Sequence, residues 1–155
     1  MRVLLLGFGA VGKSFLRLVE EQRQDLRRRY GLTPRLVGVV DSRGAAICDQ
    51  GLDPEEIFAL KEKEGTVAAH PRHGQSRTDE GLIEECRADV VIEATPTSMS
   101  DPGPAMRRLQ AAFRTGKHVV SVNKGPLAVA LPALRELCEY NGVAFRFSGD
   151  RKSVV

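Results

Sequence analysis

Three glycines near the start of the chain have a spacing that suits phosphate binding. They lie in Gly7-Phe8-Gly9-Ala10-Val11-Gly12, between an apolar segment at 2–6 and a segment whose apolar residues have helical spacing. In a Gly-x-Gly-x-x-Gly loop, the first glycine permits a tight turn and the second lets a pyrophosphate approach the backbone. The third lets the helix pack against the strand. We therefore expect this loop to bind a dinucleotide through Gly7, Phe8, Gly9, Ala10, Val11 and Gly12, with the helix N-terminus facing the phosphates.

The same residues also satisfy a second phosphate-binding pattern. Residues 7–14 read GFGAVGKS, which matches the G-x-x-x-x-G-K-S loop of nucleotide hydrolases. In that loop Lys13 would reach the β- and γ-phosphates and Ser14 would hold Mg²⁺. Pattern matching alone does not separate the two interpretations. The context favours a dinucleotide, because Gly9 has a role in the dinucleotide loop and none that the hydrolase loop requires.

An acidic residue ends the second apolar segment, where a dinucleotide fold meets the adenosine ribose. Asp41 follows the segment 36–40 and lies 29 positions after Gly12. Its carboxylate could accept a hydrogen bond from the ribose 2′-hydroxyl of NAD, and its charge would repel a 2′-phosphate. Arg43 could instead pair with that phosphate. We expect Asp41, Ser42 and Arg43 to bind the adenosine end, and both NAD and NADP to be accepted as cofactors.

Two further loops follow apolar strands in the second half of the chain. The segment 90–94 runs into Thr95-Pro96-Thr97, and 118–122 runs into Asn123-Lys124-Gly125-Pro126. Ligands of open parallel sheets bind at the carboxyl ends of the strands, so we expect Thr95, Pro96, Asn123 and Lys124 to bind cofactor. A lysine at such an end can polarise a carbonyl or hold an anionic group, or it can be a solvated surface residue. The spacing leaves both roles open for Lys124.

The elements that must position these loops alternate between strand and helix. Apolar runs predict strands at 2–6, 36–40, 90–94, 118–122 and 143–147, and helical spacing predicts helices at 11–26, 54–64, 104–115 and 132–140. Residues 66–78 resemble a loop, and the third strand of the first half is not evident. This order predicts an α/β fold with a doubly wound, mostly parallel sheet of the Rossmann type. We expect one NAD(P)-binding domain at 1–148, followed by an atypical tail at 149–155.

Composition limits the classes of function. The chain of 155 residues has a net charge of +3, which does not by itself indicate a nucleic-acid or membrane partner. Its three cysteines are far apart, which predicts neither a disulfide framework nor a zinc site. His70 and His73 lack further ligand residues nearby, so we expect a solvated loop and no metal. The start of the chain does not match a signal peptide, and we expect a cytoplasmic protein.

Several segments together resemble the N-terminal half of homoserine dehydrogenase. They are GFGAVGKSF, VVDSRGA, DVVIEATPT, DPGPAMRRLQAAFRTGKHVVSVNKGPLA and GVAFRFS, in the family's order over most of the chain. The resemblance implies an NAD(P)-dependent oxidoreductase of amino-acid biosynthesis that interconverts aspartate semialdehyde and homoserine. It places the nicotinamide between the Thr95 and Asn123 loops and gives Lys124 a catalytic position beside nicotinamide and substrate. A basic residue at the position of Arg43 recurs in family members that hold NADP.

The sequence departs from the family after Ser148. The family continues into a hinge and a second domain with the remaining acid/base residues, whereas this chain continues as GDRKSVV. We expect this chain alone to bind cofactor without turnover, to meet an amino-acid substrate only together with a second domain, and to be able to form a homo-oligomer. The alternatives are another amino-acid-pathway dehydrogenase, such as aspartate dehydrogenase, and a nucleotide-binding module without catalysis.

Overall fold

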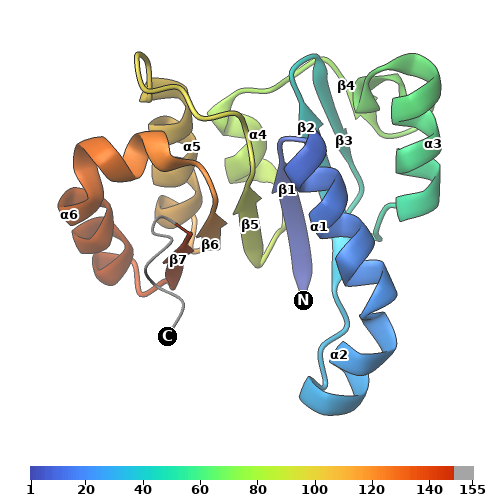
Figure 1. Ribbon diagram of the computed structural model, residues 1–155, viewed down its shortest axis with the longest axis horizontal. Helices are drawn as coiled ribbons and strands as arrows, with labels where there is room; N and C mark the ends of the chain where they lie inside the picture. Colours follow the sequence, from blue (N-terminus) through green and yellow to red (C-terminus); the bar gives the residue numbers. More distant parts are fainter. Residues whose placement is uncertain (149–155) are drawn as a thin grey trace.

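The fold is built on a seven-stranded sheet with the strand order β4-β3-β2-β1-β5-β6-β7. The computed structural model describes residues 1–148, so the predicted tail at 149–155 lies outside the described residues. Helices cover both faces of the sheet (Figure 1). The strands are β1 Arg2–Leu6, β2 Arg35–Asp41, β3 Gly44–Ile47, β4 Gly74–Gln75, β5 Val90–Glu93, β6 His118–Ser121 and β7 Phe145–Phe147. The helices are α1 Ala10–Glu21, α2 Arg23–Tyr30, α3 Pro54–Glu64, α4 Glu80–Glu85, α5 Gly103–Arg114 and α6 Lys124–Tyr140, with a short 3₁₀ turn at Val67–Ala69.

The sheet is mostly parallel, which confirms the predicted α/β fold. Strands β2, β1, β5, β6 and β7 run parallel to one another. Strand β3 turns back antiparallel to β2, and β4 is antiparallel to β3. Strand β3 of this hairpin was not evident from the sequence. The residues of β3, Gly-Ala-Ala-Ile, include almost none of the β-branched or aromatic side chains that are typical of strands.

Alternate residues of β1 contribute to two hydrophobic cores. Leu4 and Leu6 pack in the core that contains buried residues of α4, α5 and α6. Val3 and Leu5 pack in the core that contains Leu16 of α1 and Ile57 of α3. Because β1 is buried on both faces from Val3 to Leu6, these four residues are all apolar, as expected for a central parallel strand.

Two predicted helices have different bounds in the structure. The first predicted helix is divided at Gln22 into α1 and α2, and α2 ends at Gly31 in the left-handed conformation. Helix α6 begins at Lys124 and includes the helix predicted from residue 132, with a non-helical Ala130 marking the kink between its two parts. The side chain of Asn123 caps this earlier start by accepting a hydrogen bond from the Gly125 N–H. None of the helices in residues 1–148 has the length and apolar character needed to cross a membrane.

Candidate functional site

A cleft of about 970 Å³ lies at the carboxyl ends of β1, β2 and β5. Strands β2, β3 and β4 lie on one side of β1, and β5, β6 and β7 lie on the other. The cleft is located at this change of direction in the strand order. This is the point at which open α/β sheets bind their ligands. The walls are formed by residues of the glycine loop and the start of α1, the end of β2, helix α3, the loop after β5 and helix α5. Among them are Gly7, Phe8, Gly9, Ala10, Val11, Lys13, Asp41, Ser42, Lys61, Thr95, Pro96, Thr97 and Arg108.

Two glycines of the loop are required by close backbone packing. Gly7 has a φ of +92°, and a Cβ placed there would lie 2.5 Å from the carbonyl oxygen of Ala94. A Cβ at Gly12 would lie 2.0 Å from the carbonyl oxygen of Gly7. Gly12 therefore lets α1 pack directly against the end of β1, which is the part that the third glycine plays in a dinucleotide fold.

Gly9 differs from the other two glycines because the space around it is open. It precedes α1 as the N-cap, and its carbonyl accepts the first helical hydrogen bond, from the Lys13 N–H at 3.0 Å. A Cβ built at Gly9 would meet no atom within 4 Å. The N–H groups of the first turn of α1 have no partners within the helix. The loop thus offers an anion both donors and unobstructed backbone, and it fits the pyrophosphate of a dinucleotide.

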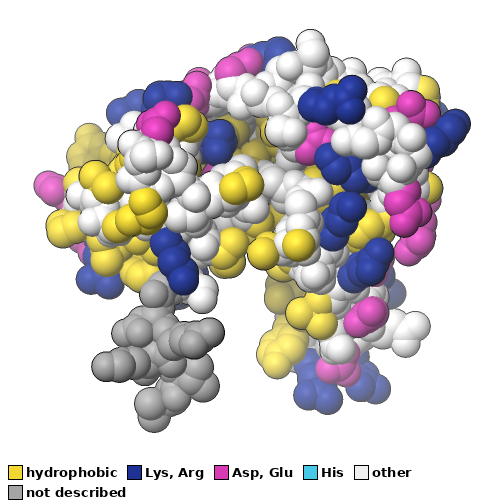
Figure 2. Space-filling model, turned by 45° about the horizontal axis from the view of Figure 1, so that its top comes forward, with side chains coloured by type: hydrophobic (Ala, Val, Ile, Leu, Met, Phe, Trp, Pro, Cys, Tyr) yellow, Lys and Arg dark blue, Asp and Glu magenta, His cyan; other side chains and the backbone are white. Residues whose placement is uncertain are grey.

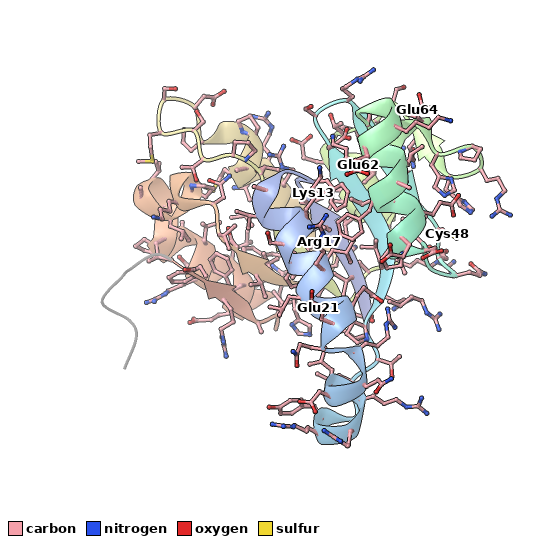
Figure 3. The ribbon with its side chains drawn as sticks, turned by 45° about the vertical axis from the view of Figure 1, so that its right-hand side comes forward. Lys13, Arg17, Glu21, Cys48, Glu62 and Glu64 are labelled. Atoms are coloured by element: carbon pink, nitrogen blue, oxygen red, sulfur yellow. The ribbon has the colours of Figure 1, made fainter. Side chains whose placement is uncertain are left out.

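Lys13, the basic residue of the hydrolase-like pattern, also lines the cleft. Its ammonium lies 6.0 Å from the centre of the Phe8 ring, which is itself buried against Phe58. Along α1, Lys13, Arg17 and Glu21 follow one another toward the far end of the helix, and Lys13 is nearest the loop (Figure 3). The position of Lys13 is compatible with the pyrophosphate of a dinucleotide and with the phosphates of a nucleoside triphosphate. Asp41, the acidic residue at the end of β2, is therefore more informative about the ligand.

The carboxylate of Asp41 is buried and already satisfied by the protein. Its Oδ1 accepts hydrogen bonds from the Arg43 N–H and the Thr66 hydroxyl, at 2.9 and 3.0 Å. Its Oδ2 accepts from Lys61 Nζ and the Val67 N–H, at 2.7 and 2.9 Å. A carboxylate has about four acceptor positions, so these donors leave little capacity for a ribose hydroxyl or a metal ion.

Opposing effects set the charge of Asp41. Burial alone would raise the pKa of this carboxyl, but hydrogen bonds from Lys61 and from the N–H groups of Arg43 and Val67 outweigh it and hold the pKa below its ordinary value. The carboxylate stays ionised at neutral pH and is paired with the Lys61 ammonium. The expected repulsion of a 2′-phosphate is therefore reduced, since a positive charge lies beside the negative one.

Lys61 is a functional candidate that sequence reasoning missed. It lies in the last turn of α3 and lines the cleft, and its ammonium contacts Asp41, 20 positions earlier in the chain. In the sequence it is one of two lysines in a charged helix, where a solvated role is the usual one. Only the fold brings α3 over the end of β2.

Arg43 lies on the turn between β2 and β3, outside the cleft walls. Its side chain is exposed, and its Nη1 is 3.5 Å from the carbonyl oxygen of Glu64 at the end of α3. Ser42, the residue before it, lines the cleft. The exposed guanidinium thus belongs to a residue that is next to the cleft wall in sequence and does not itself line it.

The two strand-end loops of the second half lie against each other. Thr95 and Pro96 line the cleft, whereas Asn123 is buried, and its Nδ2 donates to Thr95 Oγ1 at 3.1 Å. Lys124 is exposed in the first turn of α6, and its N–H donates to Thr97 Oγ1 at 3.3 Å. Of the predicted cofactor residues that the structure describes, four lie outside the cleft walls: Gly12, Arg43, Asn123 and Lys124.

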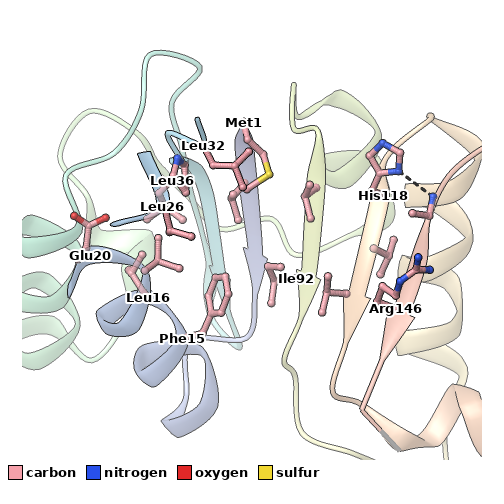
Figure 4. A pocket seen from close by; sticks show the side chains of 17 residues that line it. Met1, Phe15, Leu16, Glu20, Leu26, Leu32, Leu36, Ile92, His118 and Arg146 are labelled. Carbon is pink, nitrogen blue, oxygen red and sulfur yellow. Dashed lines mark hydrogen bonds between the residues drawn. The ribbon is translucent and has the colours of Figure 1, made fainter. Parts of the chain in front are cut away.

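A second cavity, of about 390 Å³, is lined mainly by apolar side chains (Figure 4). Phe15 and Leu16 of α1 form one side and Ile92 of β5 the centre, while His118 and Arg146 lie on the other side. The His118 Nδ1 accepts a hydrogen bond from the Ala144 N–H at 2.9 Å. These walls have few groups that could bind phosphates, so the cleft is the better candidate for a dinucleotide.

Side chains outside the cleft provide little evidence for other ligands. In the face shown in Figure 2, basic and acidic side chains are interleaved. Within residues 1–148, no group of three or more His, Cys, Asp or Glu is arranged to hold a metal ion. The expected solvated loop is wrong for His70, which is buried. Its Nδ1 accepts hydrogen bonds from the Arg72 and His73 N–H groups.

Comparison with known proteins gives a family model that covers most of the chain. The family described as "Homoserine dehydrogenase, NAD binding domain" matches residues 7–148. Homoserine dehydrogenase of Methanocaldococcus jannaschii is 36% identical over 94% of this chain and 43% of its own length. The NAD(+)-dependent homoserine dehydrogenase of Pseudomonas canavaninivorans is 35% identical over 96% of this chain and 42% of its own length. The chain thus spans less than half the length of these relatives.

Solved structures agree with the sequence relatives. The crystal structure of homoserine dehydrogenase from Thermoplasma acidophilum has a TM-score of 0.79 and 28% identity, covering 95% of this chain and 42% of that one. A hyperthermophilic archaeal homoserine dehydrogenase in complex with NADPH has a TM-score of 0.79 at 22% identity, covering 94% and 43%.

Proposed function

We propose that this chain, which belongs to the homoserine dehydrogenase family as its NAD-binding domain, is the cofactor-binding part of an enzyme that interconverts aspartate semialdehyde and homoserine. The single observation that carries the proposal is the glycine loop. Gly7 and Gly12 are fixed by backbone contacts, while Gly9 leaves space in front of the first turn of α1. A nicotinamide dinucleotide, when bound, supplies the hydride chemistry.

The residues of this chain would bind and orient the cofactor. The pyrophosphate lies against Phe8 to Val11, and the adenosine end lies toward Ser42, Lys61 and Arg43. The nicotinamide lies toward Thr95 and Pro96. Lys124, at the exposed start of α6, faces substrate held jointly with the part of the protein that the family carries beyond this region. We further propose a cytoplasmic location, which the three free thiols of Cys48, Cys86 and Cys138 support.

The polypeptide of residues 1–155 is expected to bind cofactor without oxidising homoserine. Binding needs only the cleft, whereas turnover also needs a positioned substrate and the remaining acid/base groups. The measurement is NADH and NADPH titration beside an assay of homoserine-dependent NAD(P)⁺ reduction. Homoserine-dependent reduction of NAD(P)⁺ by this purified polypeptide would contradict the prediction that it binds cofactor without turnover.

The choice between NAD and NADP is proposed to depend on Arg43. Arg43→Ala is expected to weaken NADP binding about 10- to 100-fold, or roughly 1.5–3 kcal/mol, the scale of a charged hydrogen bond. NAD binding should change by less than about twofold, since its ribose has no 2′-phosphate to pair with the guanidinium. Both dissociation constants are measured by calorimetry.

Arg72→Ala is the matched control for this prediction, because Arg72 is also an exposed loop arginine. It should leave both dissociation constants unchanged. Equal losses for NAD and NADP in Arg43→Ala would mean that the guanidinium does not recognise the phosphate. In that case Lys61, which lines the cleft, would be the remaining candidate.

A further inference from the structure

A fully buried carboxylate lies at the end of β5, beneath the loop that lines the cleft. Glu93 is 0% exposed, and its Oε2 accepts a hydrogen bond from Arg108 Nε of α5 at 3.2 Å. Its Oε1 accepts from the Thr95 N–H at 2.9 Å and from the Thr95 hydroxyl. A buried ion pair adds little stability compared with apolar residues of similar volume. Its placement under a functional loop therefore suggests a role in positioning.

The hydroxyl of Thr95 connects this ion pair to its surroundings. It donates to Glu93 Oε1 and accepts from Arg108 Nη2 and from Asn123 Nδ2, each at 3.1 Å. A hydroxyl has one donor and two acceptor positions, and all three are engaged. The Thr95 side chain is thus a fixed junction within the cleft wall, with no hydrogen-bonding position left for a ligand.

Asn123 extends the junction to the start of α6. Its Nδ2 also lies 3.4 Å from the carbonyl oxygen of Pro96, and its Oδ1 accepts from the Gly125 N–H at 3.1 Å. One continuous set of hydrogen bonds therefore joins α5, the end of β5, the end of β6 and the first turn of α6. Thr95, Pro96 and Arg108 also line the cleft.

We propose that Glu93 is a positioning residue that, with Arg108 as its counter-charge, holds the cleft wall on which the nicotinamide half of the cofactor lies. This inference rests on the proposed function, since it assumes a dinucleotide whose nicotinamide lies toward Thr95. Glu93 touches no cofactor atom itself. It acts by fixing the orientation of the Thr95 hydroxyl, which accepts a hydrogen bond from the Asn123 amide. The same amide also donates to the Pro96 carbonyl oxygen.

Two ligands that differ only in the nicotinamide test this role. Glu93→Gln keeps the shape and one acceptor but removes the charge that holds Arg108. In the 155-residue chain it is expected to weaken NADH binding about 10-fold, the scale of one charged hydrogen bond. ADP-ribose lacks the nicotinamide and should bind within about twofold of the parent. Thr95→Val should show the same selective loss, and Thr95→Ser, which retains the hydroxyl, should recover most of the NADH affinity that Thr95→Val loses.

Glu80→Gln is the matched control, because it removes an exposed ion pair with Arg107, the neighbour of Arg108 in α5. The affinities of this variant for NADH and ADP-ribose should both be unchanged. An equal loss of NADH and ADP-ribose in Glu93→Gln and Thr95→Val would overturn the inference, since it would indicate general damage to the fold. Unchanged NADH binding in both variants would overturn it and leave the proposed function standing. A parent chain that binds neither ligand would overturn both.

Discussion

Gly12→Ala is expected to lower the melting temperature of the chain by about 4–8 °C. The added methyl group would lie 2.0 Å from the carbonyl oxygen of Gly7, a backbone atom that cannot rotate away. A 2.0 Å approach to a backbone atom belongs at the upper end of the roughly 1–3 kcal/mol that overpacking costs. The better helix propensity of alanine offsets at most about 1 kcal/mol, so the net loss is about 2 kcal/mol. The clash therefore prevails, and for a domain of this size each kcal/mol lowers the melting temperature by about 2–4 °C.

The measurement is thermal unfolding followed by far-ultraviolet circular dichroism. Gly9→Ala makes the same chemical change three residues earlier, where the new Cβ meets no atom within 4 Å and φ is −91°. Its melting temperature should stay within about 2 °C of the parent, because the new methyl group meets no atom and φ is outside the left-handed region. Equal melting temperatures for Gly12→Ala and the parent would show that α1 does not pack against β1 as described.

The glycine loop and the strand ends were predictable because their information is local. Spacing alone identified residues 7–12 between a strand and a helix, and the apolar runs placed the ends of β1, β2 and β5 within a residue or two. The parallel order of the sheet then followed from the alternation of strands and helices. Strand β3 was not predicted because alanine has no preference for strands, and because its pairing with β2 depends on the turn after Asp41.

The role of Asp41 shows what local information cannot give. Its position at the end of β2 was predicted, but three of its partners, Lys61, Thr66 and Val67, lie 20 to 26 positions later. Only the return of α3 and the following 3₁₀ turn over β2 brings them together. The start of α6 was missed for a related reason, since the Asn123 cap is held by Thr95 in the loop that follows the neighbouring strand β5.

Gly9→Val is expected to abolish measurable dinucleotide binding while the fold is retained. The branched side chain would occupy the open space before α1, where a pyrophosphate must approach the backbone. Losing the contacts with the N–H groups there should weaken both NADH and NADPH at least about 100-fold, the equivalent of roughly 2.7 kcal/mol. The melting temperature should change far less than in Gly12→Ala.

Calorimetric titration of the parent chain and Gly9→Val with NADH, NADPH and Mg-ATP tests the central claim most directly. We expect the parent to bind NADH or NADPH saturably at one site, with no saturable binding of Mg-ATP, and Gly9→Val to lose the dinucleotide. The opposite result would be saturable Mg-ATP binding by the parent that Lys13→Ala removes, without binding of either dinucleotide. It would identify the loop as a nucleotide-hydrolase site and contradict its assignment to a dinucleotide.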